Sequence, residues 1–85
     1  MKITSVTTKD VMEKGKLRAF ATVVFDDQFA LHDIKVIKGD KGWFIAMPSR
    51  FNPSDGKYID ICHPLNQETR LYIQETILDY YLGRK

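Results

Sequence analysis

The residues with the most evident chemical potential lie in a polar segment, 49–57, between two apolar runs of the sequence. Arg50 stands beside Phe51, and Lys57 returns at the far end of the segment. Guanidinium and ammonium groups contact phosphates well, and arginine also binds the edge of a guanine. A neighbouring aromatic ring can stack on an unpaired base. The pattern indicates nucleic-acid binding. Its alternatives are a solvated charged surface and, for Phe51, packing under the loop or against a second subunit.

Further basic residues lie outside this segment. Lys14, Lys16 and Arg18 alternate, so we expect them to project from one face of a first hairpin. Arg84 and Lys85 follow the last apolar segment and form a second candidate phosphate contact. The formal net charge is +2 for 85 residues, so affinity for a polyanion has to come from local clustering of these cations.

Catalysis and metal binding have little support in the sequence. Cys62 and His63 are neighbours, and neighbouring residues of a strand point to opposite faces, so they cannot form a thiolate–imidazole pair with each other. The potential ligands at 32–33 and 60–63 match no zinc-binding spacing. The sequence has no phosphate-binding loop, nucleophile elbow or paired-carboxylate motif. We therefore expect no enzyme, no metal, no cofactor and no small-molecule substrate, and we interpret His63, beside Pro64, as a hydrogen-bonding residue at a corner.

Length and composition indicate one globular domain spanning 1–85. Hydrophobic residues make up 44% and charged residues 28% of the chain, which argues against disorder. A domain of this size buries proportionally little surface and often gains stability by forming oligomers. The single cysteine excludes an internal disulfide and suits a reducing compartment. No apolar run approaches the roughly 20 residues that span a bilayer, so we expect a soluble cytoplasmic protein without a membrane partner.

Hydrophobic periodicity predicts about five antiparallel strands connected as a meander. They are expected at 2–11, 17–25, 29–37, 43–47 and 58–62. Broken alternation in the first strand indicates an edge position or a bulge, and a change of phase at His32–Asp33 predicts a bulge in the third. In the second strand, apolar residues occur at both the odd and the even positions, so both of its faces are at least partly apolar. We therefore expect it to be central, with both faces covered. The polar segment 49–57 is expected to be a loop.

One helix is predicted after the strands. Pro64 prevents the last strand from continuing, Asn66 is a good N-cap, and Gly83 suits the left-handed C-terminal position. The apolar residues between them cover about half of the helix circumference, which is more than one face of a small sheet needs. The surplus indicates either packing against a second subunit or side chains, such as Tyr80 and Leu82, that are half-exposed. The fold class is therefore α+β, with an antiparallel β-sheet meander of about five strands followed by one C-terminal α-helix.

Four stretches of the sequence strongly resemble the stage V sporulation protein G (SpoVG) family, also called septation regulators. They are His32–Ile37, Phe44–Ser49, Asp60–Asn66 and Thr69–Arg70. The similarity extends from the first strand to the helix, and the Ala-Met-Pro-Ser and Asp-Ile-x-His-Pro blocks are specific at this separation. The resemblance implies a small cytoplasmic bacterial protein that forms dimers and has an antiparallel sheet followed by a helix. It also implies DNA or RNA binding, a role in septation, sporulation and gene expression, and neither enzymatic activity nor a cofactor.

The polar segment departs from the pattern that the resemblance leads us to expect. The family's typical loop has two consecutive basic residues after Met-Pro-Ser, implicated in nucleic-acid contact, and then Thr-Pro-Asp-Gly. Ser49 and Arg50 match, whereas Phe51 stands at the second basic position and one residue is inserted before Asp-Gly. Lys57 lies two positions before Ile59, where a basic residue is usual. The resemblance therefore carries a nucleic-acid role to Arg50, and Phe51 in place of a cation favours single strands or RNA over a duplex.

Our leading hypothesis is a dimeric regulator of the SpoVG type, with the homodimer formed through the sheet and the C-terminal helix. It would bind DNA and/or RNA through the 49–57 loop and influence septation, sporulation and gene expression. The nucleic-acid-binding residues are expected to be Ser49, Arg50, Phe51, Lys57, Arg84 and Lys85. The second hypothesis, from a different class, is a protein-interaction module in cell division without specific nucleic-acid binding.

Overall fold

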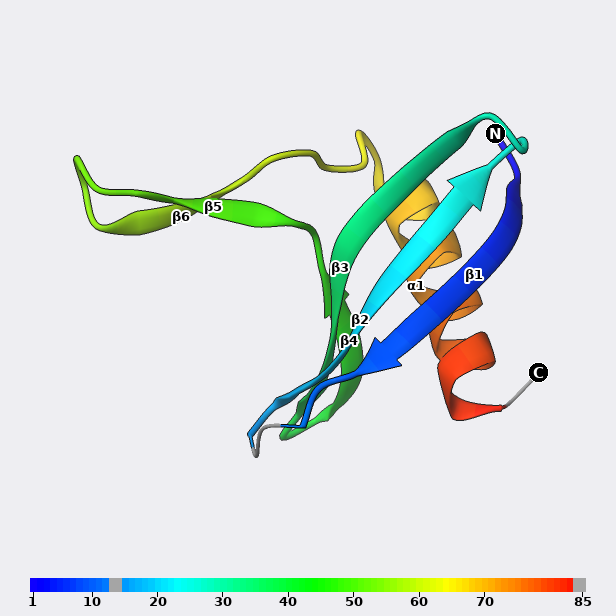
Figure 1. Cartoon of the computed structure of the whole chain (residues 1–85), viewed down its shortest axis with the longest axis horizontal. Coiled ribbons are helices and arrows are strands. Elements are labelled where there is room, and N and C mark those ends of the chain that lie inside the picture. Colours follow the sequence, from blue (N-terminus) through cyan, green and yellow to red (C-terminus); the bar gives the residue numbers. More distant parts are fainter. Residues whose placement is uncertain (13–14, 84–85) are drawn as a thin grey trace.

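The computed structural model of the chain describes residues 1–12 and 15–83, which form six strands and one helix. In chain order they are β1 (Ile3–Asp10), β2 (Leu17–Phe25), β3 (Phe29–Gly39), β4 (Gly42–Ala46), β5 (Ser49–Asn52), β6 (Lys57–Asp60) and α1 (Gln67–Leu82). The first four strands make an antiparallel sheet in the order of the chain, and β5 and β6 make a separate antiparallel pair (Figure 1). The α+β class, with antiparallel strands followed by one C-terminal helix, is confirmed.

The segment 49–57 is the main difference from the predicted arrangement. Instead of a loop, it forms β5, a turn and the first residue of β6. The predicted last strand, 58–62, pairs with β5 and does not extend the meander. Periodicity misses β5 because Arg50, Phe51 and all of β6 are exposed, so this pair of strands has no buried face to impose an apolar alternation.

The irregularities predicted in the first and third strands are confirmed. β1 is an edge strand, and its register with β2 shifts between Ile3 and Ser5. In β3, Asp33 takes a left-handed conformation with φ of 64°, at the point where the register with β2 shifts. The extra residue lets the apolar side chains on both sides of the bulge reach the same face of the sheet.

One face of the four-stranded sheet packs against α1 and forms the core. The largest side chains that are completely buried come from β2, β3, β4 and α1: Val23, Ile34, Val36, Ile45, Ile77 and Leu78. No described helix packs on the opposite face, which we call the open face, and only Pro48, Ser49 and Ile61 adjoin it, beside Phe20 and Lys35. Phe20 on β2 is 37% exposed and Phe44 on β4 is 41% exposed there. β2 is central, as predicted, but the chain itself covers only one of its two faces.

The ends of α1 follow the predicted capping residues. The Asn66 side chain accepts a hydrogen bond from the backbone N–H of Thr69 (2.8 Å), and Gly83 has a φ of 68°. These two residues satisfy backbone groups that a helix leaves unpaired at its ends. In the described part of the chain, no helix is long and apolar enough to span a membrane.

Two side chains of α1 bind the outer edge of β4. Arg70 Nη2 donates to the carbonyl oxygen of Ile45 (3.1 Å), and the backbone N–H of Ile45 donates to Gln74 Oε1 (3.4 Å). Both backbone groups of this edge residue are therefore satisfied within the chain, which protects the edge from pairing with another strand. Arg70 is in this way a structural residue of the helix–sheet interface.

Candidate nucleic-acid interface

The strands β5 and β6, together with the turn 53–56, form a projection that we call the arm. It extends away from the four-stranded sheet and from α1 (Figure 1). At its base, the N–H of Ile61 donates to the carbonyl oxygen of Pro48 (2.8 Å), which continues the pairing toward the body. The arm thus presents the residues of the predicted binding segment well clear of the rest of the molecule.

Local hydrogen bonds shape the turn of the arm. Asn52 Oδ1 accepts from the backbone N–H of Ser54, and Asp55 Oδ1 accepts from that of Lys57, both at 3.0 Å. Gly56 donates to the Asn52 carbonyl (2.9 Å) and has a φ of 69°, a conformation that glycine adopts without strain. Asparagine, aspartate and glycine at these positions therefore explain why the chain reverses here.

The pairing of β5 with β6 sorts the side chains of the arm onto two faces. Directly opposed residues of an antiparallel pair share a face, and successive residues alternate between faces. The pairs Arg50 with Ile59 and Asn52 with Lys57 define one face, which we call the cationic face. The pairs Ser49 with Asp60 and Phe51 with Tyr58 define the other, which we call the aromatic face. The structure brings Arg50 and Lys57 together and separates both from Phe51.

The cationic face is suited to binding a polyanion. Arg50 and Lys57 are diagonal neighbours on adjacent strands, a relation that places Cα atoms about 7–8 Å apart. Both side chains are exposed, and among the described residues neither has a hydrogen-bond or ion-pair partner. The carboxylate of Asp60 belongs to the aromatic face, so the cationic face has no neutralising acidic side chain of its own strands.

The aromatic face carries a ring pair that hydrophobic periodicity does not predict. Phe51 and Tyr58 pack edge to face, with ring centroids 5.3 Å apart. They nevertheless remain 52% and 71% exposed. The available signal was the cluster of turn-forming residues at 52–56, because a four-residue turn at 53–56 pairs Asn52 with Lys57 and therefore Phe51 with Tyr58.

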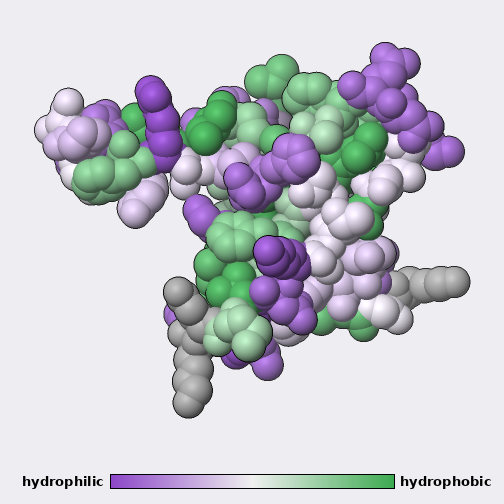
Figure 2. Space-filling model, in the orientation of Figure 1, coloured by the Kyte–Doolittle hydropathy of each residue, from purple (hydrophilic) through white to green (hydrophobic). Residues whose placement is uncertain are grey.

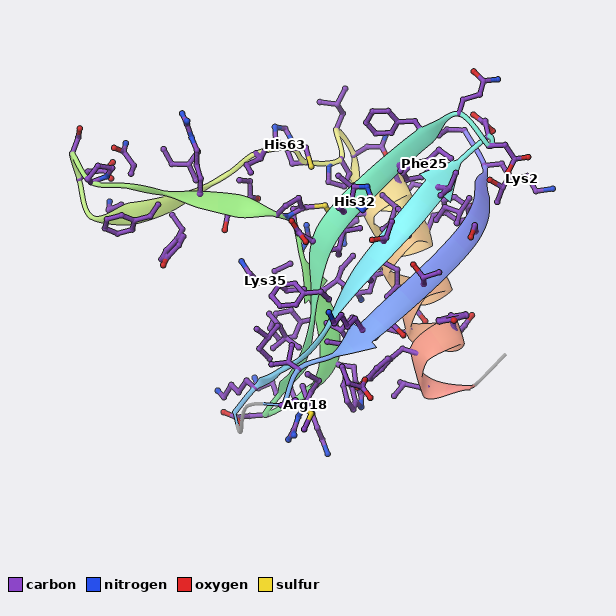
Figure 3. The ribbon with its side chains drawn as sticks, in the orientation of Figure 1. Lys2, Arg18, Phe25, His32, Lys35 and His63 are labelled. Carbon is purple, nitrogen blue, oxygen red and sulfur yellow. The ribbon has the colours of Figure 1, made fainter. Side chains whose placement is uncertain are left out.

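Ser49 has a structural partner at the base of the arm. It is half-buried, and its hydroxyl accepts a hydrogen bond from Lys35 Nζ on β3 (3.2 Å). Lys35 leaves the sheet on the side from which the arm projects (Figure 3). Ser49 therefore links the arm to the sheet and positions Lys35, and it is less accessible than Arg50.

The remaining predicted cations are not gathered at the arm. Lys14, Arg84 and Lys85 lie outside the described residues, and the described end of α1 lies across the body from the arm (Figure 1). Lys16 forms an exposed ion pair with Asp40 (3.5 Å). A register shift in β2 next to Arg18 breaks the regular alternation on which a shared basic face depends. Because Lys14 lies outside the described residues, the shared basic face of the first hairpin stays a prediction.

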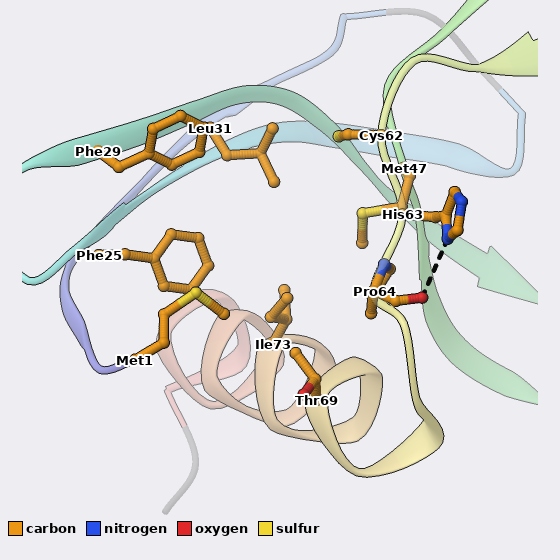
Figure 4. Close-up of a pocket in the computed structure, with 10 residues that line it drawn as sticks. All are labelled: Met1, Phe25, Phe29, Leu31, Met47, Cys62, His63, Pro64, Thr69 and Ile73. Carbon is orange, nitrogen blue, oxygen red and sulfur yellow. Dashed lines mark hydrogen bonds between the residues drawn. The ribbon is translucent and has the colours of Figure 1, made fainter.

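Cys62 and His63 lie beside an apolar cavity of about 180 Å³ between the sheet and the start of α1 (Figure 4). His63 Nδ1 donates to the Pro64 carbonyl oxygen (3.1 Å), in agreement with its interpretation as a corner residue. Burial, and secondarily the charge of Asp60, raises the pKa of the Cys62 thiol above its ordinary value. A raised pKa keeps the thiol protonated and unreactive near neutral pH. The described residues contain no group of three or more histidine, cysteine or carboxylate side chains that could hold a metal ion.

Comparisons with known proteins agree on one family. A sequence model described as SpoVG matches residues 1–82. Relatives of this chain carry the name "Putative septation protein SpoVG", and three of them are described here. The relative from Lachnospira eligens is 51% identical over 95% of this chain and 91% of its own length. Those from Clostridium perfringens (strain 13 / Type A) and Clostridium novyi (strain NT) are 53% and 52% identical over 95% of this chain, covering 89% and 80% of their own lengths.

Proposed function

The chain belongs to the SpoVG family of septation proteins, and we propose that it is a nucleic-acid-binding regulator whose contact surface is the cationic face of the arm. We propose further that it acts in the cytoplasm as a homodimer, influencing septation and gene expression through DNA or RNA.

The observation that carries this proposal is the placement of Arg50 and Lys57. Both are exposed on one face of a projecting two-stranded ribbon. A ribbon of this width fits the major groove of a duplex and can equally lie along a single strand. A cation without an internal partner loses no ion pair when it contacts a phosphate, so both residues are available for binding.

The aromatic face supports the homodimer part of the proposal. A two-stranded hairpin without further packing is at best marginally stable in water. Phe51 and Tyr58 expose more than half of their surface on this hairpin, and Leu71 and Tyr80 of α1 are also exposed, at 46% and 55%. A second copy packed on the aromatic face would cover the rings and leave the cationic face open to nucleic acid.

The proposal is tested by titrating labelled duplex and single-stranded probes with Arg50→Ala and Lys57→Ala variants at several salt concentrations. Each variant should weaken binding and lower the slope of log affinity against log salt by about 0.7–0.9, the value for one lost phosphate contact. Lys41→Ala is the matched control, because Lys41 is an exposed cation in the turn between β3 and β4. Unchanged affinity and slope in both arm variants would contradict the proposal.

The same arm favours a second candidate function, a protein-interaction module in cell division. The observation that favours this second function is the exposed ring pair of Phe51 and Tyr58, because aromatic residues are enriched in protein interfaces. If nucleic acid binds with no preference for any sequence at physiological salt, and the Arg50 and Lys57 variants retain function in cells, this second function is the correct one.

A further inference from the structure

We propose that the open face of the four-stranded sheet is a stacking platform for single-stranded nucleic acid, centred on Phe20. This inference depends on the proposed function only in taking nucleic acid as the ligand, because it assigns a surface and a strand type that the arm does not define. The platform is a second contact surface, on the body of the molecule.

The pairing of the strands places Phe20 between two cations. Lys9 of β1 and Lys35 of β3 are its direct partners on either side, so all three side chains stand on the open face. Directly opposed residues have Cβ atoms about 4.5–5.5 Å apart. A base stacked on Phe20 would therefore have an ammonium group within reach of the phosphate on each side of it.

A second aromatic ring lies in the next row of the open face. Phe44 of β4 is paired with Ile37 of β3, and it is 41% exposed. A Cβ atom at Gly39 would come within 2.8 Å of the Phe44 ring, so the ring lies directly over that glycine. Two partly exposed rings on adjacent rows give successive bases two surfaces on which to stack.

A groove connects the platform to the base of the arm. It has a volume of about 340 Å³ and is lined by Phe20, Asp33, Lys35, Pro48, Ser49 and Ile61. Lys35 is held there by its hydrogen bond to Ser49, so its ammonium group is positioned before a ligand arrives. The Asp33 carboxylate repels phosphate but accepts hydrogen bonds from the amino group of a base, as of cytosine. The groove therefore favours an unpaired base at Asp33 and a phosphate at Lys35.

The composition of the open face favours nucleic acid over a second copy of the chain. The row on the other side of Phe20 from Phe44 is polar, with Thr7, Thr22 and a hydrogen bond between Thr22 and His32 (3.1 Å). Lysine is depleted in protein interfaces, because an ammonium group is costly to remove from water. Hydrophobic and hydrophilic side chains are interspersed on the body surface beside the arm (Figure 2). The aromatic face of the arm, which has no lysine, is the better surface for a second copy.

The experiment compares Phe20→Leu with Phe29→Leu in the full-length chain. Leucine keeps an apolar side chain but removes the ring, and Phe29 is a matched exposed ring, 62% exposed and packed near Phe25 on the helix side of the sheet. The probe is a labelled mixed-sequence RNA of about 12 nucleotides, alone and annealed to its complement. Phe20→Leu should weaken single-strand binding about tenfold. Duplex binding, and both affinities of Phe29→Leu, should be unchanged. Lys9→Ala should lower the single-strand salt slope by about 0.7.

Each other result has a definite meaning. If Phe20→Leu keeps its single-strand affinity while the Arg50 and Lys57 variants bind more weakly, the platform is contradicted and the arm is the contact surface. If Phe20→Leu binds single strands more weakly while the Arg50 and Lys57 variants keep their affinity, the arm is contradicted as a contact surface and the platform is supported. Unchanged single-strand affinity combined with weaker self-association, measured by sedimentation, assigns the open face to a second copy and also overturns the proposal. A thermal melt of each variant, followed by circular dichroism, establishes that the variant is folded at the temperature of the binding assay.

Discussion

Replacing Arg70 by alanine should destabilise the fold without weakening nucleic-acid binding. Arg70 is the basic residue of the helix that would first be chosen as a phosphate contact, but its Nη2 donates to the carbonyl oxygen of Ile45 at 3.1 Å. Ile45 is completely buried and lies on the edge strand β4. Alanine removes the donor and leaves that carbonyl without its partner from α1.

The magnitude follows from the type of hydrogen bond. A bond with a charged partner contributes about 1.5–3 kcal/mol, and leaving an acceptor unsatisfied costs about 1–3 kcal/mol. Arg70 is half-buried, so solvent reduces the effect, and we expect a loss of about 1–2 kcal/mol. For a domain of this size, each kcal/mol lowers the Tm by about 4–8 °C. The melting temperature should therefore fall by about 4–16 °C.

Arg50→Ala is the matched control, because it removes the same side chain from an exposed position without an internal partner. Its stability should change by no more than about 0.5 kcal/mol. Thermal melts followed by circular dichroism at one fixed protein concentration give the Tm, and probe titrations well below both Tm values give the affinity. We expect Arg70→Ala to lose stability and keep affinity, and Arg50→Ala to do the opposite. An Arg70→Ala variant with an unchanged Tm and weakened binding would refute the structural role of this arginine.

Three further predictions concern the helix cap, the arm and the free thiol. Asn66→Ala removes the acceptor for the Thr69 N–H and should cost about 1 kcal/mol in chemical denaturation, whereas Asn66→Asp should retain most of the stability. Phe51→Ser and Tyr58→Ser should each weaken self-association in sedimentation, and an unchanged dimer in both would exclude the aromatic face as the interface. The raised pKa of Cys62 means that the folded state favours the neutral thiol. The stability that this preference contributes is fully present at neutral pH, and it is lost as the pH rises from the ordinary pKa of 9.0 through the higher pKa of the folded state. Iodoacetamide should accordingly react more slowly with the native than with the unfolded protein near pH 9, and equal rates would count against this burial effect.

Local chemistry made part of the fold predictable. The bulge at Asp33 follows from a change of phase between Leu31 and Ile34, because side-chain parity is a property of consecutive residues. Asn66 and Gly83 mark the helix ends because each residue satisfies or relieves the backbone within one turn of itself. The arm was not predictable in the same way, since its strands are exposed and show no apolar alternation. The turn-forming residues from Asn52 to Gly56 were its available signal.

The sequence by itself determined the family, the α+β class, the helix caps and the presence of cations around the segment 49–57. Each of these depends on residue type and short spacing, which a linear chain displays directly. The tertiary structure decided which side chains share a surface. Strand pairing put Arg50 with Lys57 and turned Phe51 away from them, and helix packing directed Arg70 to the edge of β4. It also aligned Lys9, Phe20 and Lys35 across three strands, a relation that arises only when distant segments pair in register.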